Sequence, residues 1–541
     1  MWNQIYDPMG NIWFSALIAF LPIICFFLCL VVFKLKGHVA ALLTVIFASL
    51  VAIFAYKMPL LKVISALGYG FLYGLWPIAW IIIAAIFLYK LSIKSGQFSI
   101  IKQSVLSITP DKRIQVILIG FCFGAFLEGA IGFGGPVAIT AALLAGLGLR
   151  PLYAAGLCMI ANTAPVAFGA VGIPIIAMAG AVNADVLKIA AMTGIMLTPL
   201  TIFVPFFIIF LMDGFKGVKD TWSALLVASV SYAIAQLLTS VLIGPELPGV
   251  ISAIVSLLAT TIFLKYWQPK NIVYLDKQEI EEKLTFRKVI FAWSPFLILI
   301  MVIVLWTQSF FKTLFADGGI LAFTQLSIIF SELNGLVMQN QPVVTEPTAM
   351  KAIFSFPIIN TVGSAILVAA IISAIIAKIK LNIAISTFKE TLNEMKFPIL
   401  TIGLVLSFAY ISNYSGLSAT LAIALAHTGD AFVFFSPIIG WIGVFLTGSD
   451  TSSNLLFGTL QKVTAMQLNI KDTLFLAANS VGGVIGKMIS PQSIAIACAA
   501  VGLVGKESDL FRFTIKYSIA FIIFVGIWAA FIAYVIPFII P

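Results

Sequence analysis

Glu128 is the first residue whose surroundings suggest chemistry. It lies in the segment Phe126–Pro136, which has apolar sequence on both sides and contains four glycines and a proline. Inside a helix, glycine costs about 1 kcal/mol and proline about 3 kcal/mol relative to alanine, so the chain is expected to turn or unwind here. A carboxyl group in apolar surroundings is costly while ionised, which makes Glu128 a candidate proton carrier. The predicted helix breaks are Gly129, Gly132, Gly134, Gly135 and Pro136.

A second acidic residue, Asp450, lies in the segment Thr447–Asn454, where seven of the eight side chains are polar. Polar residues at this density are unusual between apolar segments and predict a wet pocket. Hydroxyl and amide groups can donate hydrogen bonds to a carboxylate or accept them from a ligand hydroxyl. Asp450 is therefore a second candidate proton carrier. The candidate binding residues beside it are Thr451, Ser453 and Asn454, and Gly448 is a predicted break.

Two asparagine-bearing segments, 162–165 and 479–483, form a third kind of interruption. The second of them leads to Lys487, the only basic residue among the predicted broken helices. A carboxylate ligand needs a positive or dipolar partner, which Lys487 can supply. A permanent ion pair of Lys487 with Asp450 or Glu128 is an equally good interpretation. The remaining candidate binding residues are Asn162, Thr163, Asn479, Ser480, Ser490 and Gln492, and the remaining predicted breaks are Gly482, Gly483 and Gly486.

Each acidic segment also has a plainer interpretation. Glu128 is compatible with a structural ion pair or a position at the membrane rim, and its glycines with tight helix packing. The segment around Asp450 is compatible with a hydrophilic loop at the membrane face. These alternatives can be told apart only by whether the breaks lie together.

The rest of the chain predicts where these groups lie. Of its 541 residues, 61% are hydrophobic and only 10% charged, against about 25% charged in soluble proteins. The apolar residues occur in runs of about 17 to 25, long enough to cross a bilayer as helices, and show no alternating barrel pattern. We therefore expect an all-α multi-pass membrane protein of about 12–14 transmembrane helices. The net charge of +10 lies in short loops, which excludes a nucleic-acid-binding domain.

Basic loops predict the orientation, because lysine and arginine favour the cytoplasmic side. On this rule the stretch 265–288 is a cytoplasmic linker between two halves, and both termini lie outside. The first half is 1–264, with a core over 64–212, and the second is 289–541, with a core over 396–541. The five cysteines have no metal-like spacing, and no metal or cofactor site is expected.

The two cores resemble each other at three places in the same order, which predicts an internal repeat. Lysines and an arginine follow Gly96, whereas no lysine or arginine follows Gly416 until Lys462, so the two copies are predicted to be inverted. Inverted repeats with broken helices are typical of secondary transporters that bind their solute near the midplane. The matching stretches are Pro77–Gly96 with Pro398–Gly416, Gly124–Gly129 with Gly443–Gly448, and Ala161–Pro174 with Ala478–Pro491.

Two long stretches closely resemble the bacterial lactate permease family. The first runs from Gly124 to Ile175 and includes Phe-Leu-Glu128-Gly and Ala161-Asn-Thr-Ala-Pro165. The second runs from Gly443 to Lys516 and includes Thr447-Gly-Ser-Asp450-Thr-Ser-Ser-Asn454 and Gly486-Lys487-Met-Ile-Ser-Pro-Gln492-Ser. The resemblance extends over nearly the whole chain and is least distinctive in the linker and in 309–355.

The resemblance implies a proton symporter of the bacterial inner membrane that takes up L-lactate, with D-lactate and glycolate as further substrates. It also implies kinship with carriers built on inverted repeats, some of which work as homodimers. A sodium-coupled carrier for a dicarboxylate or another organic anion is the closest alternative, and a passive channel is a second. An enzyme is not expected, because the chain has no His-Glu-x-x-His motif and no persuasive Ser/His or Asp/Asp arrangement.

Overall fold

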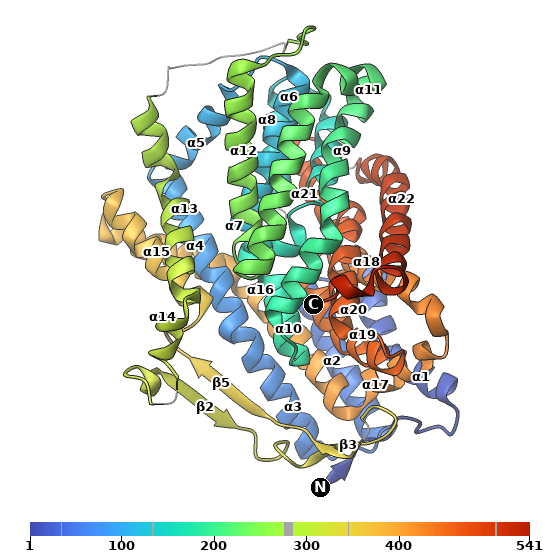
Figure 1. Ribbon diagram of the computed structural model, residues 1–541. Coiled ribbons are helices and arrows are strands. Elements are labelled where there is room, and N and C mark those ends of the chain that lie inside the picture. Colours follow the sequence, from blue (N-terminus) through green and yellow to red (C-terminus); the bar gives the residue numbers. More distant parts are fainter. Residues whose placement is uncertain (34, 133–134, 275–284, 317, 345, 504–505) are drawn as a thin grey trace.

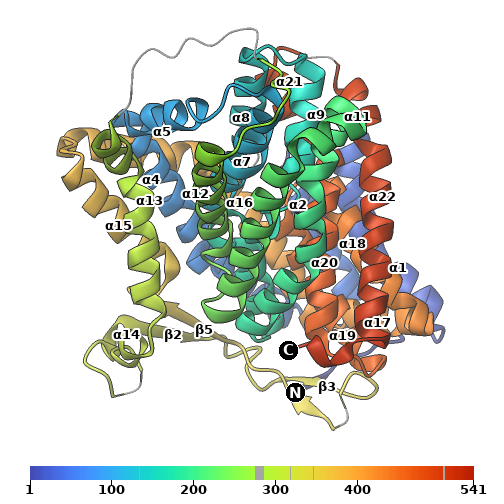
Figure 2. The same ribbon diagram turned by 45° about the horizontal axis from the view of Figure 1, so that its top comes forward.

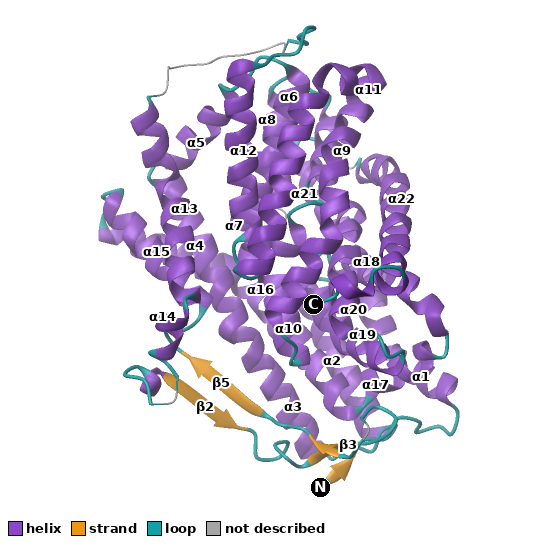
Figure 3. Ribbon diagram, viewed as in Figure 1, coloured by secondary structure: helices purple, strands orange, loops and turns teal. Residues whose placement is uncertain are grey.

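The computed structural model describes residues 1–541 except 34, 133–134, 275–284, 317, 345 and 504–505. Helices dominate it, as Figure 1 and Figure 3 show. This confirms the helical prediction: apolar runs without alternation fold as helices because a helix satisfies its own backbone hydrogen bonds in lipid. The predicted break at Gly134 and the middle of the predicted linker, 275–284, lie outside the described residues.

The helices of the first half follow one another with few long connections. Short π-helical turns at Leu28–Val32, Gly74–Ala79 and Ile117–Phe123 and a 3₁₀ turn at Val166–Phe168 join some of them. The helices are α1 (Ile12–Phe27), α2 (Gly37–Phe54), α3 (Leu60–Tyr73), α4 (Trp80–Lys94), α5 (Gln97–Leu106), α6 (Lys112–Val116), α7 (Gly124–Ala130), α8 (Gly135–Gly146), α9 (Pro151–Ala161), α10 (Gly169–Val182), α11 (Val186–Leu242) and α12 (Pro248–Tyr266).

The second half repeats the same kind of short, interrupted helices around its polar segments. A 3₁₀ turn at Lys487–Ile489 separates two of them. The helices are α13 (Phe286–Thr307), α14 (Ser309–Thr313), α15 (Val362–Ile376), α16 (Leu381–Ser415), α17 (Leu417–Ala426), α18 (Phe432–Thr447), α19 (Asp450–Gln467), α20 (Asp472–Gly486), α21 (Pro491–Ala500) and α22 (Glu507–Tyr534).

Among the described residues, eight helices are long and apolar enough to cross a membrane, or up to eleven if each bent pair is one span. The difference from the expected twelve to fourteen lies partly in α11, which counts once although it turns back at Gly214 (φ 63°). Its two arms lie side by side, since Thr201 donates a hydrogen bond to Gln236 across 35 positions. Three apolar helices, Ile12–Phe26, Gly135–Gly146 and Val362–Ile376, are also shorter than a full span.

The strands are the part of the fold that helical periodicity does not predict. They form two small sheets at one end of the molecule (Figure 3), and in one of these sheets β1 pairs in parallel with β3. The antiparallel pair β2–β5 crosses the same end beneath α3 and α14 in Figure 1. The strands are β1 (Trp2–Asn3), β2 (Gln325–Ile329), β3 (Val337–Gln339), β4 (Thr348–Ala349) and β5 (Ile353–Pro357).

Interrupted helices of the two halves pack against one another inside the bundle. In both Figure 1 and Figure 2, α8 and α21 lie toward the upper end and α17 and α19 toward the lower end. Helix α8 packs against α21, and α10 packs against α19, so elements of the first half pair with elements of the second. This pairing is what an inverted repeat requires, and the inversion itself stays a prediction.

Candidate functional site

One pocket collects residues from all four interruptions. It contains about 530 Å³ of empty space, part of it open to the outside. From the first half, the α7–α8 region contributes Glu128 and Gly132, and the α9–α10 break contributes Val166, Gly169, Ala170 and Pro174. From the second half, the α18–α19 turn contributes Gly448, Ser449, Asp450 and Thr451, and the α20–α21 break contributes Lys487, Gln492, Ser493 and Ile496.

Local backbone geometry turns the chain at the two hairpin tips. Gly132 (φ +67°) follows α7, and Gly448 (φ +73°) ends α18, both in the left-handed region that favours glycine. Ser449 then caps α19, because its hydroxyl accepts a hydrogen bond from the Ser452 amide at 3.3 Å. Asp450 is thereby placed in the first turn of α19, at the positive end of the helix dipole.

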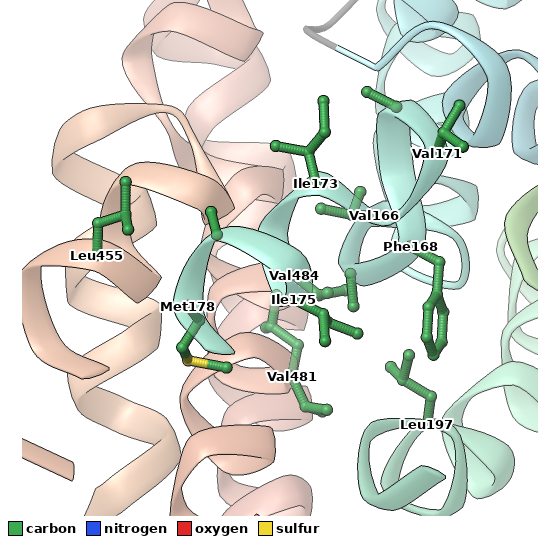
Figure 4. Packing of buried hydrophobic residues seen from close by; sticks show 14 of the residues in the cluster. Val166, Phe168, Val171, Ile173, Ile175, Met178, Leu197, Leu455, Val481 and Val484 are labelled. Carbon is green, nitrogen blue, oxygen red and sulfur yellow. The ribbon is translucent and has the colours of Figure 1, made fainter. Parts of the chain in front are cut away.

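The break before and inside α10 is strained and is held by packing. Ala170 (φ 44°) and Val171 (φ 58°) both have left-handed backbone, which is unfavourable for residues with a Cβ and most of all for a branched one. Figure 4 shows apolar side chains packed around this segment, among them Val166, Ile173 and Val484. All of these are at most 3% exposed. Buried packing therefore stabilises the strained backbone that lines the pocket here.

Lys487 and Glu128 form a buried ion pair across the pocket. The Lys487 Nζ atom lies 2.6 Å from Glu128 Oε1, and the two side chains are 10% and 2% exposed. The second carboxylate oxygen of Glu128 has no hydrogen-bond partner among the described residues. The close approach needs Gly169, because a Cβ there would lie 3.0 Å from Glu128 Oε1. This pair fits the sequence-based interpretation of Lys487 as a counter-ion to a carboxyl group.

Asp450 has a different environment from Glu128. Its Oδ2 atom accepts hydrogen bonds from Ser480 Oγ at 2.7 Å and from Asn454 Nδ2 at 3.4 Å, and its Oδ1 atom has no partner among the described residues. No described cation forms an ion pair with it; Lys487 lines the same pocket and is paired with Glu128. The pocket thus holds two carboxyl groups and one ammonium group.

The structure brings together five of the twelve side chains proposed for proton coupling or binding. Glu128, Asp450, Lys487, Thr451 and Gln492 line the pocket, and Gln492 is exposed where the pocket opens. Asn162 instead faces a smaller neighbouring cavity that Lys487 and Ser493 also line.

The other six proposed binding residues are turned into the protein. Ser453 donates to the Gly440 carbonyl, Thr163 to the Ile160 carbonyl, and Ser490 to Ser493. The remaining three, Asn454, Asn479 and Ser480, are fully buried and hydrogen-bond to one another or to Asp450.

Three of the predicted breaks need correction. Gly482 and Gly483 lie inside the continuous helix α20, and the interruption comes after Gly486, at the 3₁₀ turn that starts at Lys487. These glycines serve packing: a Cβ at Gly482 would collide with the Pro437 carbonyl, and one at Gly483 with Asp450 Oδ1. Similarly, Gly129 belongs to the last turn of α7 and touches Gly249 of α12, while Gly135 and Pro136 begin α8.

Sequence reasoning missed several residues of the pocket. Ser449 was within the polar segment but was not selected, and Ser493 follows Gln492 directly. Ala170 and Pro174 also line it, although neither residue has a polar side chain that would mark it as a site residue. The only available signal was the Gly-rich stretch from Gly169 to Gly172 next to an asparagine-bearing break.

Comparison with known proteins bears on this arrangement. The family model described as L-lactate permease matches residues 15–536. The chain belongs to the L-lactate permease family. It is 57% identical over 549 residues to the L-lactate permease of Escherichia coli K12, with all of both chains covered. It is 54% identical over 552 residues to the glycolate permease GlcA of the same strain, covering 99% of this chain and 98% of that one. The L-lactate permease of Bacillus subtilis strain 168 is 49% identical over 547 residues, with 97% of each chain covered.

Solved structures are more distant from this family member. The Alcanivorax borkumensis YdaH transporter shares 13% identity with a TM-score of 0.44, over 84% of this chain and 85% of that one. Neisseria gonorrhoeae MtrF, from a class of antimetabolite efflux pumps, shares 13% identity with a TM-score of 0.47, over 88% and 85%. The lactate permease family is therefore established here by sequence over the full chain.

Proposed function

We propose that this protein imports L-lactate, together with D-lactate and glycolate, by proton symport across the bacterial inner membrane, with both termini outside. The names of its relatives support the substrates, since lactate and glycolate permeases are 54–57% identical to it over nearly its full length. The observation that carries the coupling is the pocket itself, where Lys487 faces two carboxyl groups, Glu128 and Asp450.

The charges of the pocket explain why a proton and a lactate anion would move together. With both carboxyls ionised, the site holds one positive and two negative charges, and a third anion is repelled. Protonation of Asp450 removes one negative charge, and lactate then restores it. The loaded site has the same net charge as the empty one, so the cost of carrying it through the low-dielectric barrier is not raised by the anion.

Asp450 is the better coupling group of the two carboxyls. Glu128 is ion-paired with Lys487 at 2.6 Å, and neutralising one partner of a buried pair leaves the other charge uncompensated, which costs several kcal/mol. Asp450 is held only by the neutral donors Ser480 and Asn454, so its protonation breaks no ion pair. We assign the proton to Asp450 and the role of fixed counter-ion to Glu128.

The lactate carboxylate would bind beside Lys487, where hydroxyl groups surround the free space. Ser449, Thr451 and Ser493 line this part of the pocket and can bond the carboxylate or the 2-hydroxyl group. A small 2-hydroxy acid can therefore be recognised through its charge and its hydroxyl at once. Gln492, exposed at the opening, would be met first by an entering solute.

Uptake of labelled L-lactate by purified protein in liposomes tests the proposal. An imposed gradient, acidic outside, should drive accumulation above equilibrium, and unlabelled D-lactate and glycolate should compete. Accumulation that does not respond to the pH gradient would exclude proton symport. Absence of counterflow would indicate a passive channel instead.

Replacement of sodium by choline separates proton coupling from sodium coupling. Lactate uptake is expected to be equal in the two salts. Uptake that requires sodium and prefers a dicarboxylate would overturn the proposal in favour of its closest alternative.

A further inference from the structure

A row of buried polar side chains leads to Asp450 from the interior of the second half. Ser436 Oγ donates to Gln461 Oε1 at 2.8 Å, Gln461 Nε2 donates to Asn479 Oδ1 at 3.1 Å, and Asn479 Nδ2 donates to Asn454 Oδ1 at 2.9 Å. All four side chains have 0% exposure. We call Ser436, Gln461, Asn479 and Asn454 the amide chain.

The amide chain ends on the carboxyl group by two routes. Asn454 Nδ2 donates to Ser480 Oγ at 3.2 Å, and Ser480 Oγ donates in turn to Asp450 Oδ2 at 2.7 Å. Asn454 Nδ2 also lies 3.4 Å from Asp450 Oδ2 directly. Every donor in the row therefore points toward Asp450, and every acceptor points away from it.

Backbone carbonyls set this direction, because a carbonyl can only accept. The Ser436 carbonyl accepts from Gln461 Nε2 at 2.9 Å, which places the amide nitrogen of Gln461 and not its oxygen on that side. At the other end, the Pro174 carbonyl accepts from Asn454 Nδ2 at 3.2 Å. Pro174 belongs to the strained break in α10, so the row also connects the two halves of the protein.

A row of hydrogen bonds aligned in one direction polarises its members in the same sense. The positive ends of the amide and hydroxyl dipoles converge on Asp450 Oδ2 and favour the ionised carboxylate. The positive charge of Lys487 in the pocket also favours the ionised form of Asp450, whereas the negative charge of Glu128 disfavours it. The buried position of Asp450 disfavours its charge, so the amide chain opposes the effect of burial.

We propose that Gln461 and Asn479, which do not line the pocket, are positioning residues that set the pH range of coupling by aligning, through Asn454, the hydrogen bonds that Asp450 accepts. Neither residue touches the substrate in this account. The inference rests on the proposed function, because it concerns the protonation of the proposed coupling carboxyl. Without the amide chain, Asp450 should keep its proton to higher pH, so lactate uptake should persist in more alkaline medium.

The test is the pH profile of lactate uptake by Gln461→Leu in proteoliposomes. The midpoint of the profile should move to higher pH by up to about 0.5 unit, because the variant removes the polarisation that Gln461 passes on through Asn479 and Asn454 and no hydrogen bond to Asp450 itself. Gln236→Leu is the matched control, since Gln236 is equally buried and donates to the Ala164 carbonyl, but no carboxyl group receives its hydrogen bonds. This control is expected to keep the wild-type midpoint even if its maximal rate falls.

A second variant keeps the inference testable if Gln461→Leu does not fold. Asn479→Ala cuts the row one step closer to Asp450 and should shift the midpoint in the same direction. An unchanged midpoint in the folded variants, or an equal shift in Gln236→Leu, would overturn the inference. Failure of the wild-type protein to couple uptake to the pH gradient would instead refute the proposed function, so the two failures are distinct.

Discussion

The ammonium group of Lys487 lies 2.6 Å from the carboxylate of Glu128, although 359 positions separate the two residues in the sequence. Both are buried, and each lies at a helix interruption in a different half of the chain. The contact therefore exists only when the two halves are assembled, and it fixes the only described lysine of the pocket beside one of its two carboxyls.

Breaking this pair should destabilise the protein more than removing it entirely. We expect Lys487→Met to lower the free energy of unfolding by about 3–5 kcal/mol, because Glu128 is left as an uncompensated buried charge. The double variant Glu128→Gln/Lys487→Met should recover most of that loss without recovering lactate uptake. Melting temperatures in detergent measure the stability, and equal melting temperatures of the single and double variants would contradict the prediction.

The two carboxyls should respond differently to neutralisation. Asp450→Asn is expected to retain lactate exchange across the membrane while losing its dependence on the pH gradient, because the site is then permanently in its proton-loaded charge state. Glu128→Gln should keep the pH dependence and change the apparent affinity for lactate, since Lys487 loses its counter-ion. Uptake and counterflow by both variants over a pH series check this, and the reverse pattern would assign the proton to Glu128.

Gly483 should be intolerant of even a methyl group. A Cβ at this position would collide with Asp450 Oδ1, and a shift of buried groups of this kind costs about 1–3 kcal/mol, so Gly483→Ala should reduce uptake about ten-fold or more. Gly146→Ala is the control, because Gly146 is also helical and a Cβ there meets nothing within 4 Å. Equal uptake by the two alanine variants would show that Asp450 can move freely.

Glu246, in the loop between α11 and α12, should make stability depend on pH. Burial raises the pKa of this carboxyl to about 7 from its ordinary value of 4.5, and its own backbone amide and Lys312 only partly oppose the rise. Because the folded state holds the proton more tightly than the unfolded state, stability is lost as pH rises from 4.5 toward 7.

The loss at Glu246 amounts to at most about 3 kcal/mol. Glu246→Gln should therefore raise the melting temperature at pH 8 and leave it unchanged at pH 4. Glu346→Gln, at an exposed position, serves as the control and should have no effect at either pH. A larger gain at acidic pH than at alkaline pH would contradict the assigned direction.

The features of the site that follow from residue type could be predicted from the sequence. Glycine, proline and acidic residues inside apolar runs indicated the interruptions, and Glu128, Asp450 and Lys487 were expected near them because charged groups are costly in lipid. All three line one pocket. The helical class follows from the same composition.

Other features depend on neighbours that a single sequence does not reveal. The glycines at positions 482 and 483 indicated a helix break. In the structure they instead leave room for the Pro437 carbonyl and for Asp450, which a Cβ at either position would crowd. Asn479 looked like a binding residue, but its amide is used inside the protein by Gln461 and Asn454. The strands at one end were missed because runs of two to five residues are too short to show a regular alternation.

The most direct test of the account is to measure proton uptake on lactate binding. Purified protein in weakly buffered detergent, about one pH unit above the midpoint of its uptake profile, receives saturating L-lactate in the presence of a pH indicator. The wild-type protein and Glu128→Gln should take up protons, approaching about one per lactate bound, and Asp450→Asn should bind lactate without taking up any. Lactate binding to the wild-type protein without proton uptake, or undiminished proton uptake by Asp450→Asn, would contradict the claim that Asp450 couples the two.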